Sequence, residues 1–139
     1  MFTKLHHVAI ICSDYDCSKH FYVNVLGLNV IQETFREEQQ SYKLDLAVGG
    51  HTQIELFSFV EAPERLSYPE ARGLRHVAFE VQDINRVVQK LKSKGVDTIE
   101  NLRIDELTGK RFTFFQDPDG LPIEIYENSD EIVKEIVEK

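Results

Sequence analysis

Apolar and polar residues alternate in short runs along this chain, and two helical patterns interrupt the alternation. The strand-like runs cover residues 5–12, 28–34, 42–48 and 53–59, and then 74–81, 96–102, 111–116 and 121–127. Helical spacing of apolar residues appears over 15–26 and again over 83–94. Ser13 or Asp14 is a candidate N-cap of the first helix and Asp83 of the second. Each half of the chain therefore predicts the order strand, helix, strand, strand, strand.

The two halves are duplicates of each other. The segment Leu5-His6-His7-Val8-Ala9 returns with one substitution as Leu74-Arg75-His76-Val77-Ala78, an offset of 69 residues. The same offset places Glu55 on Glu124 and Phe57 on Tyr126. We therefore predict an α+β fold of two tandem βαβββ modules within one domain, residues 1–139. The modules span about 4–59 and about 74–127, with a linker at about 60–73 and a C-terminal helix at about 129–139.

Composition narrows the class of protein. Apolar residues make up 42% and charged residues 29%, which is typical of a globular chain, and no apolar run is long enough to span a membrane. The net charge of −8 disfavours nucleic acid as a partner, because phosphate binding requires clustered cations. The N-terminus lacks a signal-peptide pattern, and Cys12 and Cys17 lie too close together for a disulfide framework. We expect a cytoplasmic protein.

One His and one Glu in each half are expected on the sheet face that carries no helix. Residues two apart along a strand point to the same side, and the apolar side packs against the helix. The helix side holds Val8, Ile10, Cys12, Ile54 and Leu56, with Val77, Phe79, Val81, Ile123 and Ile125 in the second half. The opposite face then includes His7, Glu55, His76 and Glu124. Two imidazoles and two carboxylates are a typical donor set for a first-row transition metal.

A structural interpretation of these residues competes with the metal interpretation. A single His on a strand is more often hydrogen-bonded than metal-bound, and a Glu among apolar neighbours can extend to water. A carboxylate among apolar residues is costly to bury unless a cation compensates it, and Glu55 and Glu124 repeat this situation. The duplication therefore favours a metal site. The side chains that we expect to lie outside this site are His6, His20, His51 and Glu80.

At this point the sequence resembles the vicinal-oxygen-chelate (VOC) superfamily, which includes glyoxalase I, methylmalonyl-CoA epimerase, fosfomycin-resistance proteins, bleomycin-binding proteins and extradiol dioxygenases. The resemblance covers nearly the whole chain and is specific for the superfamily rather than for one reaction. It rests on 5–10, on His20-Phe21-Tyr22 with Val25-Leu26-Gly27-Leu28, on 53–57, on 75–79, and on Asp117-Pro118-Asp119-Gly120 followed by Ile123-Glu124. It implies curled mixed sheets around a metal cleft, and a homodimer.

The resemblance also implies a function. His7, Glu55, His76 and Glu124 fall on the family's metal-ligand positions, as in glyoxalase I. This implies a lyase or isomerase that binds one divalent ion (Ni, Co, Zn, Mn or Fe) and acts on a small vicinal-oxygen substrate through a metal-stabilised enediolate. Glu124 would be the catalytic base, with Glu55 as its mirror partner.

The chain departs from glutathione-using members at two positions. Those members carry an Arg four residues after the first metal His and an Asn four residues after the first metal Glu, where this chain has Ile11 and Phe59. Glutathione is therefore not predicted as the thiol. The alternative functions are a small-molecule-binding, sequestering protein of the bleomycin-resistance kind, and a dioxygenase or thiol transferase.

Overall fold

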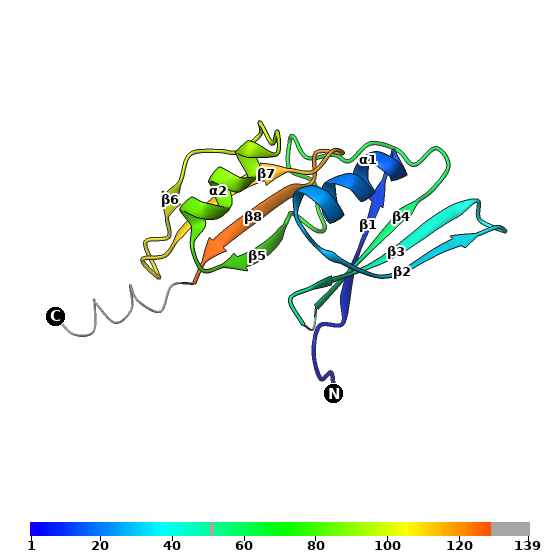
Figure 1. Cartoon of the computed structure of the whole chain (residues 1–139), viewed down its shortest axis with the longest axis horizontal. Coiled ribbons are helices and arrows are strands. Elements are labelled where there is room, and N and C mark those ends of the chain that lie inside the picture. The colour runs from blue at the N-terminus through cyan, green and yellow to red at the C-terminus, as the bar shows by residue number, and fades with distance from the viewer. Residues whose placement is uncertain (51, 129–139) are drawn as a thin grey trace. The chain divides into compact units, whose positions relative to one another are not determined.

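The computed structural model describes residues 1–50 and 52–128 and confirms the predicted α+β class (Figure 1). The chain divides into two compact units, Met1–Arg65 and Leu66–Lys139. The first contains β1 (His7–Cys12), α1 (Tyr15–His20), a π-helical turn η1 (Phe21–Val25), β2 (Asn29–Arg36), β3 (Ser41–Val48) and β4 (Thr52–Ser58). The second contains β5 (Val77–Val81), α2 (Ile84–Ser93), β6 (Arg103–Ile104), β7 (Arg111–Gln116) and β8 (Pro122–Glu127). Position 51 and the predicted helix at 129–139 lie outside the described residues.

Each unit holds one open, four-stranded mixed sheet of the same topology. The strand order is β1-β4-β3-β2 in the first unit and β5-β8-β7-β6 in the second. The first and last strands of each unit pair in parallel, and the remaining pairs are antiparallel. The parallel pair is possible because a helix lies between its two strands in sequence. This pairing places the duplicated segments of each unit side by side, with the Glu position on the last strand and the His position at or just before the start of the first.

The first unit buries one face of its sheet. Its core consists of Ile10, Cys12, Tyr22, Leu44, Leu46, Ile54 and Leu56, each exposed by 7% or less. Of the two predicted N-cap candidates, Asp14 caps α1, because its Oδ1 accepts a hydrogen bond from the Cys17 amide at 3.1 Å. The single α-helix expected over 15–26 is wrong in its second half, where the Leu26 amide donates to the carbonyl of Phe21 at 2.9 Å in the π-helical turn. Apolar spacing did not distinguish the two geometries.

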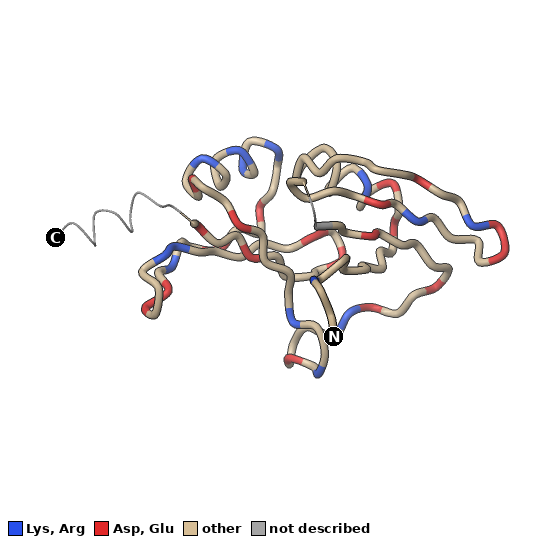
Figure 2. The backbone as a smooth tube through the Cα atoms, turned by 90° about the horizontal axis from the view of Figure 1, so that it is seen from below, with Lys and Arg blue, Asp and Glu red and all other residues tan. Residues whose placement is uncertain are grey.

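The second unit repeats this arrangement with α2 packed against β8 (Figure 1). Asp83 caps α2 as predicted, with its Oδ1 accepting from the Arg86 amide at 3.1 Å. The core side chains are Ile84, Leu91, Phe115, Leu121, Ile123 and Ile125. Basic residues gather along α2 (Figure 2), and Lys90 and Lys92 lie in its last turn, where the helix dipole favours them.

Two predicted strands of the second unit have the wrong bounds. The strand expected at 96–102 is absent, and β6 is only Arg103–Ile104. The segment contacts β7 through one backbone bond, from the Glu100 amide to the Phe114 carbonyl at 2.9 Å, and through side chains. Thr113 Oγ1 donates to the Glu100 carbonyl at 2.8 Å, and Thr98 Oγ1 accepts from the Gln116 amide at 3.0 Å. The strand expected from residue 74 begins at Val77. His76 therefore precedes β5 by one residue.

A buried ion pair joins the helix and the sheet of the second unit. The side chain of Glu127 is only 2% exposed and accepts from Arg111 Nε at 2.9 Å and Nη2 at 2.8 Å. It also accepts from the Ile84 amide, at the start of α2, at 3.0 Å. Burial alone would raise the pKa of Glu127, but the hydrogen bonds from Arg111 and Ile84 lower it below its ordinary value. This carboxylate is ionised and structural.

Candidate functional site

In the first unit, His7 and Glu55 lie side by side on the sheet face opposite the core. Ala9 of β1 pairs with Glu55 of the parallel strand β4, so His7, two residues earlier, is the diagonal neighbour of Glu55. His7 Nδ1 lies 3.2 Å from Glu55 Oε2. The His7 side chain is 41% exposed and that of Glu55 only 11%. One imidazole and one shielded carboxylate thus form a polar pair on this face.

In the second unit, His76 and Glu124 form the same pair at the duplicated positions. Ala78 of β5 pairs with Glu124 of β8, which again makes the His the diagonal neighbour of the Glu. His76 Nε2 lies 3.5 Å from Glu124 Oε2, and the side chains are 26% and 15% exposed. The pairing of Ala9 with Glu55 and of Ala78 with Glu124 therefore brings the His of each unit beside its Glu, through Nδ1 of His7 and Nε2 of His76.

The predicted alternation of the strands is confirmed by burial. Ile54 and Leu56 are 1% and 0% exposed, and Glu55 between them points to the other face, where it meets His7. On β1, Ile10 is buried whereas Ile11 is 54% exposed. Ile123 and Ile125, on either side of Glu124, are likewise buried.

The surroundings of Glu55 include charged residues that the sequence analysis missed. Lys43 Nζ lies 3.5 Å from Glu55 Oε1 and 3.3 Å from Asp45 Oδ1. Asp45 on β3 pairs directly with Glu55. The alternation of residues 43 and 45 with the buried Leu44 and Leu46 predicts the sheet face that they occupy. Only the register between β3 and β4 shows that they lie beside Glu55.

The surroundings of His76 are aromatic and basic instead. The ring of Phe114, which pairs with Glu124 across the sheet, meets the His76 ring edge to face at 5.0 Å. Arg75 Nη1 lies 2.9 Å from His76 Nδ1, and Arg75 also pairs with Glu70 at 3.2 Å. The ion pair with Glu70 raises the pKa of Arg75 above its ordinary value. The second pair therefore has a different set of neighbours from the first.

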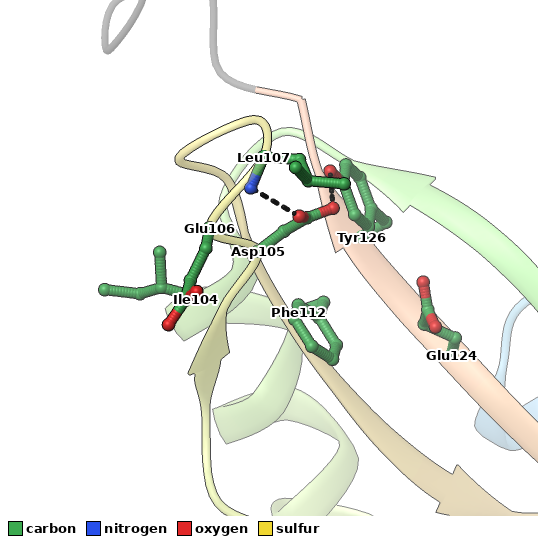
Figure 3. Close-up of a pocket in the computed structure, with 7 residues that line it drawn as sticks. All are labelled: Ile104, Asp105, Glu106, Leu107, Phe112, Glu124 and Tyr126. Atoms are coloured by element: carbon green, nitrogen blue, oxygen red, sulfur yellow. Dashed lines mark hydrogen bonds between the residues drawn. The ribbon is translucent and has the colours of Figure 1, made fainter.

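A pocket of about 470 Å³ lies beside Glu124 within the second unit (Figure 3). Its lining consists of Ile104, Asp105, Glu106, Leu107, Phe112, Glu124 and Tyr126. In Figure 3, Glu124 and Phe112 point from adjacent strands toward the same side, and the 105–107 segment closes one end. Of these residues, only Glu124 is a site residue predicted from the sequence.

The remaining histidines and Glu80 take no part in the two pairs. Glu80 and His20 are exposed, and His20 ends α1. His6 is exposed and touches the neighbouring His7, with the two Nδ1 atoms 3.0 Å apart. His51 lies outside the described residues.

The donor atoms of the two pairs suit a divalent transition metal, since imidazole nitrogen and carboxylate oxygen are its usual protein ligands. Both carboxylates are largely shielded from water, where a compensating cation is most valuable. Each unit supplies one His and one Glu. Among the described residues, no three His, Cys, Asp or Glu side chains are grouped closely enough to hold a metal ion.

Within the part of the chain that the structure describes, no helix is long and apolar enough to cross a membrane.

Comparison with known proteins places this chain in a family. The model of the Glyoxalase/Bleomycin resistance protein/Dioxygenase superfamily matches residues 4–125. The uncharacterised protein YwkD of Bacillus subtilis (strain 168) is 61% identical over 124 residues, which cover 89% of this chain and 96% of YwkD. Glyoxylase I 4 of Arabidopsis thaliana is 32% identical over 131 residues, which cover 88% of this chain and 70% of that protein.

A solved structure agrees with the sequence comparison. The crystal structure of the glyoxalase family protein from Enterococcus faecalis matches with a TM-score of 0.83 and 48% identity, covering 91% of this chain and 98% of the other. The matched family name spans several reactions, so membership by itself does not define the substrate. The chain belongs to the Glyoxalase/Bleomycin resistance protein/Dioxygenase superfamily, which is the vicinal-oxygen-chelate superfamily.

Proposed function

We propose that this protein is a metal-dependent lyase or isomerase of the glyoxalase type that acts on a small substrate with neighbouring oxygens. The observation that carries the proposal is the duplicated His and Glu pair, His7 with Glu55 and His76 with Glu124. We propose that the four side chains together hold one divalent ion. Bound there, such an ion would act as a Lewis acid toward the substrate oxygens.

The role of the protein side chains follows from their surroundings. The reaction requires a base to take the proton from the carbon next to the substrate oxygens. One oxygen of Glu55 lies 3.5 Å from the ammonium of Lys43, whereas Glu124 pairs with His76 and interacts with the Arg75 guanidinium only through its charge. Glu124 is therefore the better placed carboxylate to accept the proton, and Glu55 remains a ligand.

Glutathione is not part of the proposed substrate. Ile11 and Phe59 occupy the two positions at which glutathione-using relatives carry polar residues, and both side chains are partly open to solvent, at 54% and 38%. Neither can hydrogen-bond or pair with the charged ends of a tripeptide. The similarity to Glyoxylase I 4 supports the reaction type and not the thiol.

The remaining expectations from the sequence belong to the same proposal. We propose that both units act as modules of one domain over residues 1–139, as a homodimer in the cytoplasm. Dimers are common in this superfamily, which supports the oligomeric state. The metal content and the oligomeric state of the protein should be measured on the same preparation.

Metal content by elemental analysis of the natively purified protein tests the proposal. The wild type should contain about one divalent ion per four-ligand site, and His76→Ala and Glu124→Gln should lose most of it. Glu80→Gln is the matched control. Glu80 is an exposed carboxylate of β5, and its replacement should leave the metal in place. A wild type without divalent metal would reject the site.

A reaction assay then separates an enzyme from a binding protein. The metal-loaded protein should isomerise the hemithioacetal of methylglyoxal and 2-mercaptoethanol, or exchange its carbon-bound proton with deuterium from solvent. If the protein binds metal and this compound but exchanges no proton, it is a sequestering protein. Oxygen consumption in the Fe-loaded form would identify a dioxygenase instead.

A further inference from the structure

The pocket beside Glu124 is built mainly from apolar and aromatic side chains. Phe112 and Tyr126 stack with ring centroids 6.3 Å apart and an interplanar angle of 17°. Leu107 and Ile104 line the pocket but are 96% and 64% exposed. Its volume of about 470 Å³ is in the range of small-molecule sites. A flat apolar group that entered this pocket would cover surface that now contacts water.

The wall of the pocket is held in place by hydrogen bonds. Tyr126 Oη donates to Asp105 Oδ2 at 2.9 Å, and Asp105 Oδ1 accepts from the Leu107 amide at 3.0 Å (Figure 3). Thr108 Oγ1 also hydrogen-bonds to Tyr126 Oη. The Gly109 amide closes the loop by donating to the Asp105 carbonyl at 2.7 Å. The segment that carries Leu107 is therefore preorganised, which reduces the entropy lost on binding.

The charge of the pocket is negative. Asp105, Glu106 and Glu124 contribute three carboxylates, and no Lys or Arg occurs among the described residues that line it. The hydrogen bonds from the Leu107 amide and from Tyr126 lower the pKa of Asp105, so it stays ionised at neutral pH.

The basic residues that flank the lining in sequence, Arg103, Lys110 and Arg111, do not belong to it. Arg103 lies over the Phe112 ring at 5.1 Å and pairs with Glu100 at 3.7 Å. Lys110 Nζ donates to Asn128 Oδ1 at 2.7 Å. An anionic group in the pocket would face these carboxylates, and no Lys or Arg among the described lining residues would offset the repulsion.

The fold does not require this negative lining. At the positions of the first unit that correspond to Asp105 and Phe112, the chain carries the cations Arg36 and Lys43. Arg36 lies over the Phe57 ring at 4.8 Å, and Lys43 pairs with Glu55. The second unit therefore differs from the first in carrying an acidic and an aromatic residue at these two positions, where the first unit carries cations.

We propose that the substrate of this protein carries an uncharged, flat apolar group next to its chelating oxygens, and that this group occupies the pocket of Phe112, Tyr126, Leu107 and Asp105. The pocket rejects substrates that are anionic at this end. This inference rests on the proposed function for the chelating part of the substrate, since Glu124 belongs to both.

Two hydroxamates that differ in one charge test the inference. Hydroxamates present two neighbouring oxygens, and the probes are 4-methylbenzohydroxamate and 4-carboxybenzohydroxamate. Calorimetric titration of the zinc-loaded protein should give a dissociation constant about tenfold higher for the carboxylate, from its repulsion by Asp105 and Glu106. Glu106→Lys should reduce this ratio to about threefold or less. Glu37→Lys, the same charge change in the exposed turn between β2 and β3, is the control and should leave the ratio unchanged.

A metal-independent measurement keeps this inference distinct from the proposed function. In two-dimensional NMR spectra, the methyl probe should shift the amide signals of Leu107 and Tyr126 in both zinc-loaded and metal-free protein. If zinc fails to bind while these signals shift, the proposed metal site is wrong and the pocket assignment stands. Equal affinities for the two probes, tighter binding of the carboxylate, or unmoved Leu107 and Tyr126 signals would overturn the pocket assignment.

Discussion

The two units share a fold and a His-Glu pair but place different residues around that pair. Residues that are 69 positions apart occupy equivalent places in the two sheets, since Glu55 pairs with Ala9 as Glu124 pairs with Ala78. Four pairs of equivalent neighbours, with the residue of the first unit given first, are Lys43 and Phe112, Asp45 and Phe114, Arg36 and Asp105, and Phe57 and Tyr126. The backbone register preserves the pair, while the flanking positions are free to diverge. The lining of the pocket beside Glu124 includes two of these divergent positions, Asp105 and Phe112.

The units also differ in how the helix is tied to the sheet. In the second, the buried Glu127 joins Arg111 to the start of α2. In the first, Lys19 and Tyr15 of α1 hydrogen-bond to Glu33 of β2 at 2.7 and 2.5 Å, on a surface that is open to water. The bond from Lys19, followed by that from Tyr15, lowers the pKa of Glu33. The two connections therefore differ mainly in the burial of the carboxylate and less in the number of hydrogen bonds that it accepts.

The largest expected effect concerns the two equivalent carboxylates. Glu124→Gln should lower kcat for the hemithioacetal of methylglyoxal by about 10²–10⁴-fold, because a positioned base contributes that much. Glu55→Gln, at the equivalent place, should lower kcat by only about tenfold once saturated with metal, because it removes a ligand and not the base. Kinetics at saturating zinc measure both values.

The order of the two effects decides the assignment. If the loss is larger for Glu55→Gln, the base belongs to the first unit. Equal losses, accompanied by equal losses of metal, would make both residues ligands only.

Glu127→Gln should have the next largest effect, on stability. We expect a loss of about 3 kcal/mol in the free energy of unfolding at pH 7, because it breaks a buried ion pair and weakens the bond to the start of α2. Lys19→Met breaks the exposed pair with Glu33 in the other unit, and its loss should stay at about 0.5 kcal/mol. Urea denaturation followed by circular dichroism measures both.

Acidification gives a second measurement on the same variant. The folded pKa of Glu127 is lowered, so its contribution is complete above the ordinary Glu pKa of about 4.3 and is lost as the pH falls through the folded value. The difference between wild type and Glu127→Gln should therefore stay constant from pH 7 to about pH 5 and shrink below about pH 4. A difference that does not change down to pH 2 would show that charge is not the cause.

The smallest expected effect concerns Lys43. Its ammonium lies 3.5 Å from a Glu55 oxygen and 3.3 Å from Asp45, and so competes with a metal ion for the same negative charge. Lys43→Met should bind zinc about threefold to tenfold more tightly in competition with a chromophoric chelator, as expected from removing one nearby cation. Lys19→Met, which removes an equal charge away from Glu55, is the control. Weaker binding in Lys43→Met would mean that Lys43 orients Glu55 and does not compete for it.

Much of the fold followed from alternation and from the repeat. The buried positions Ile54 and Leu56, the caps Asp14 and Asp83, and the order of elements in each unit were predictable, because side-chain direction and helix capping are local properties. The strand at 96–102 was predicted wrongly because Thr98 and Thr113 provide side-chain bonds where a backbone ladder was expected. The hydrophobic pattern does not report which hydrogen-bonding groups a segment will use.

The four residues His7, Glu55, His76 and Glu124 stood out in the sequence by themselves, because duplicated charges within apolar strands are costly and demand an explanation. Their neighbours did not stand out. Lys43 and Phe112 are ordinary residues in alternating strands, and only the pairing of β3 with β4 and of β7 with β8 brings them beside the two carboxylates. A strand pattern determines which face a side chain takes, whereas the register between strands, a nonlocal property, determines what it meets there.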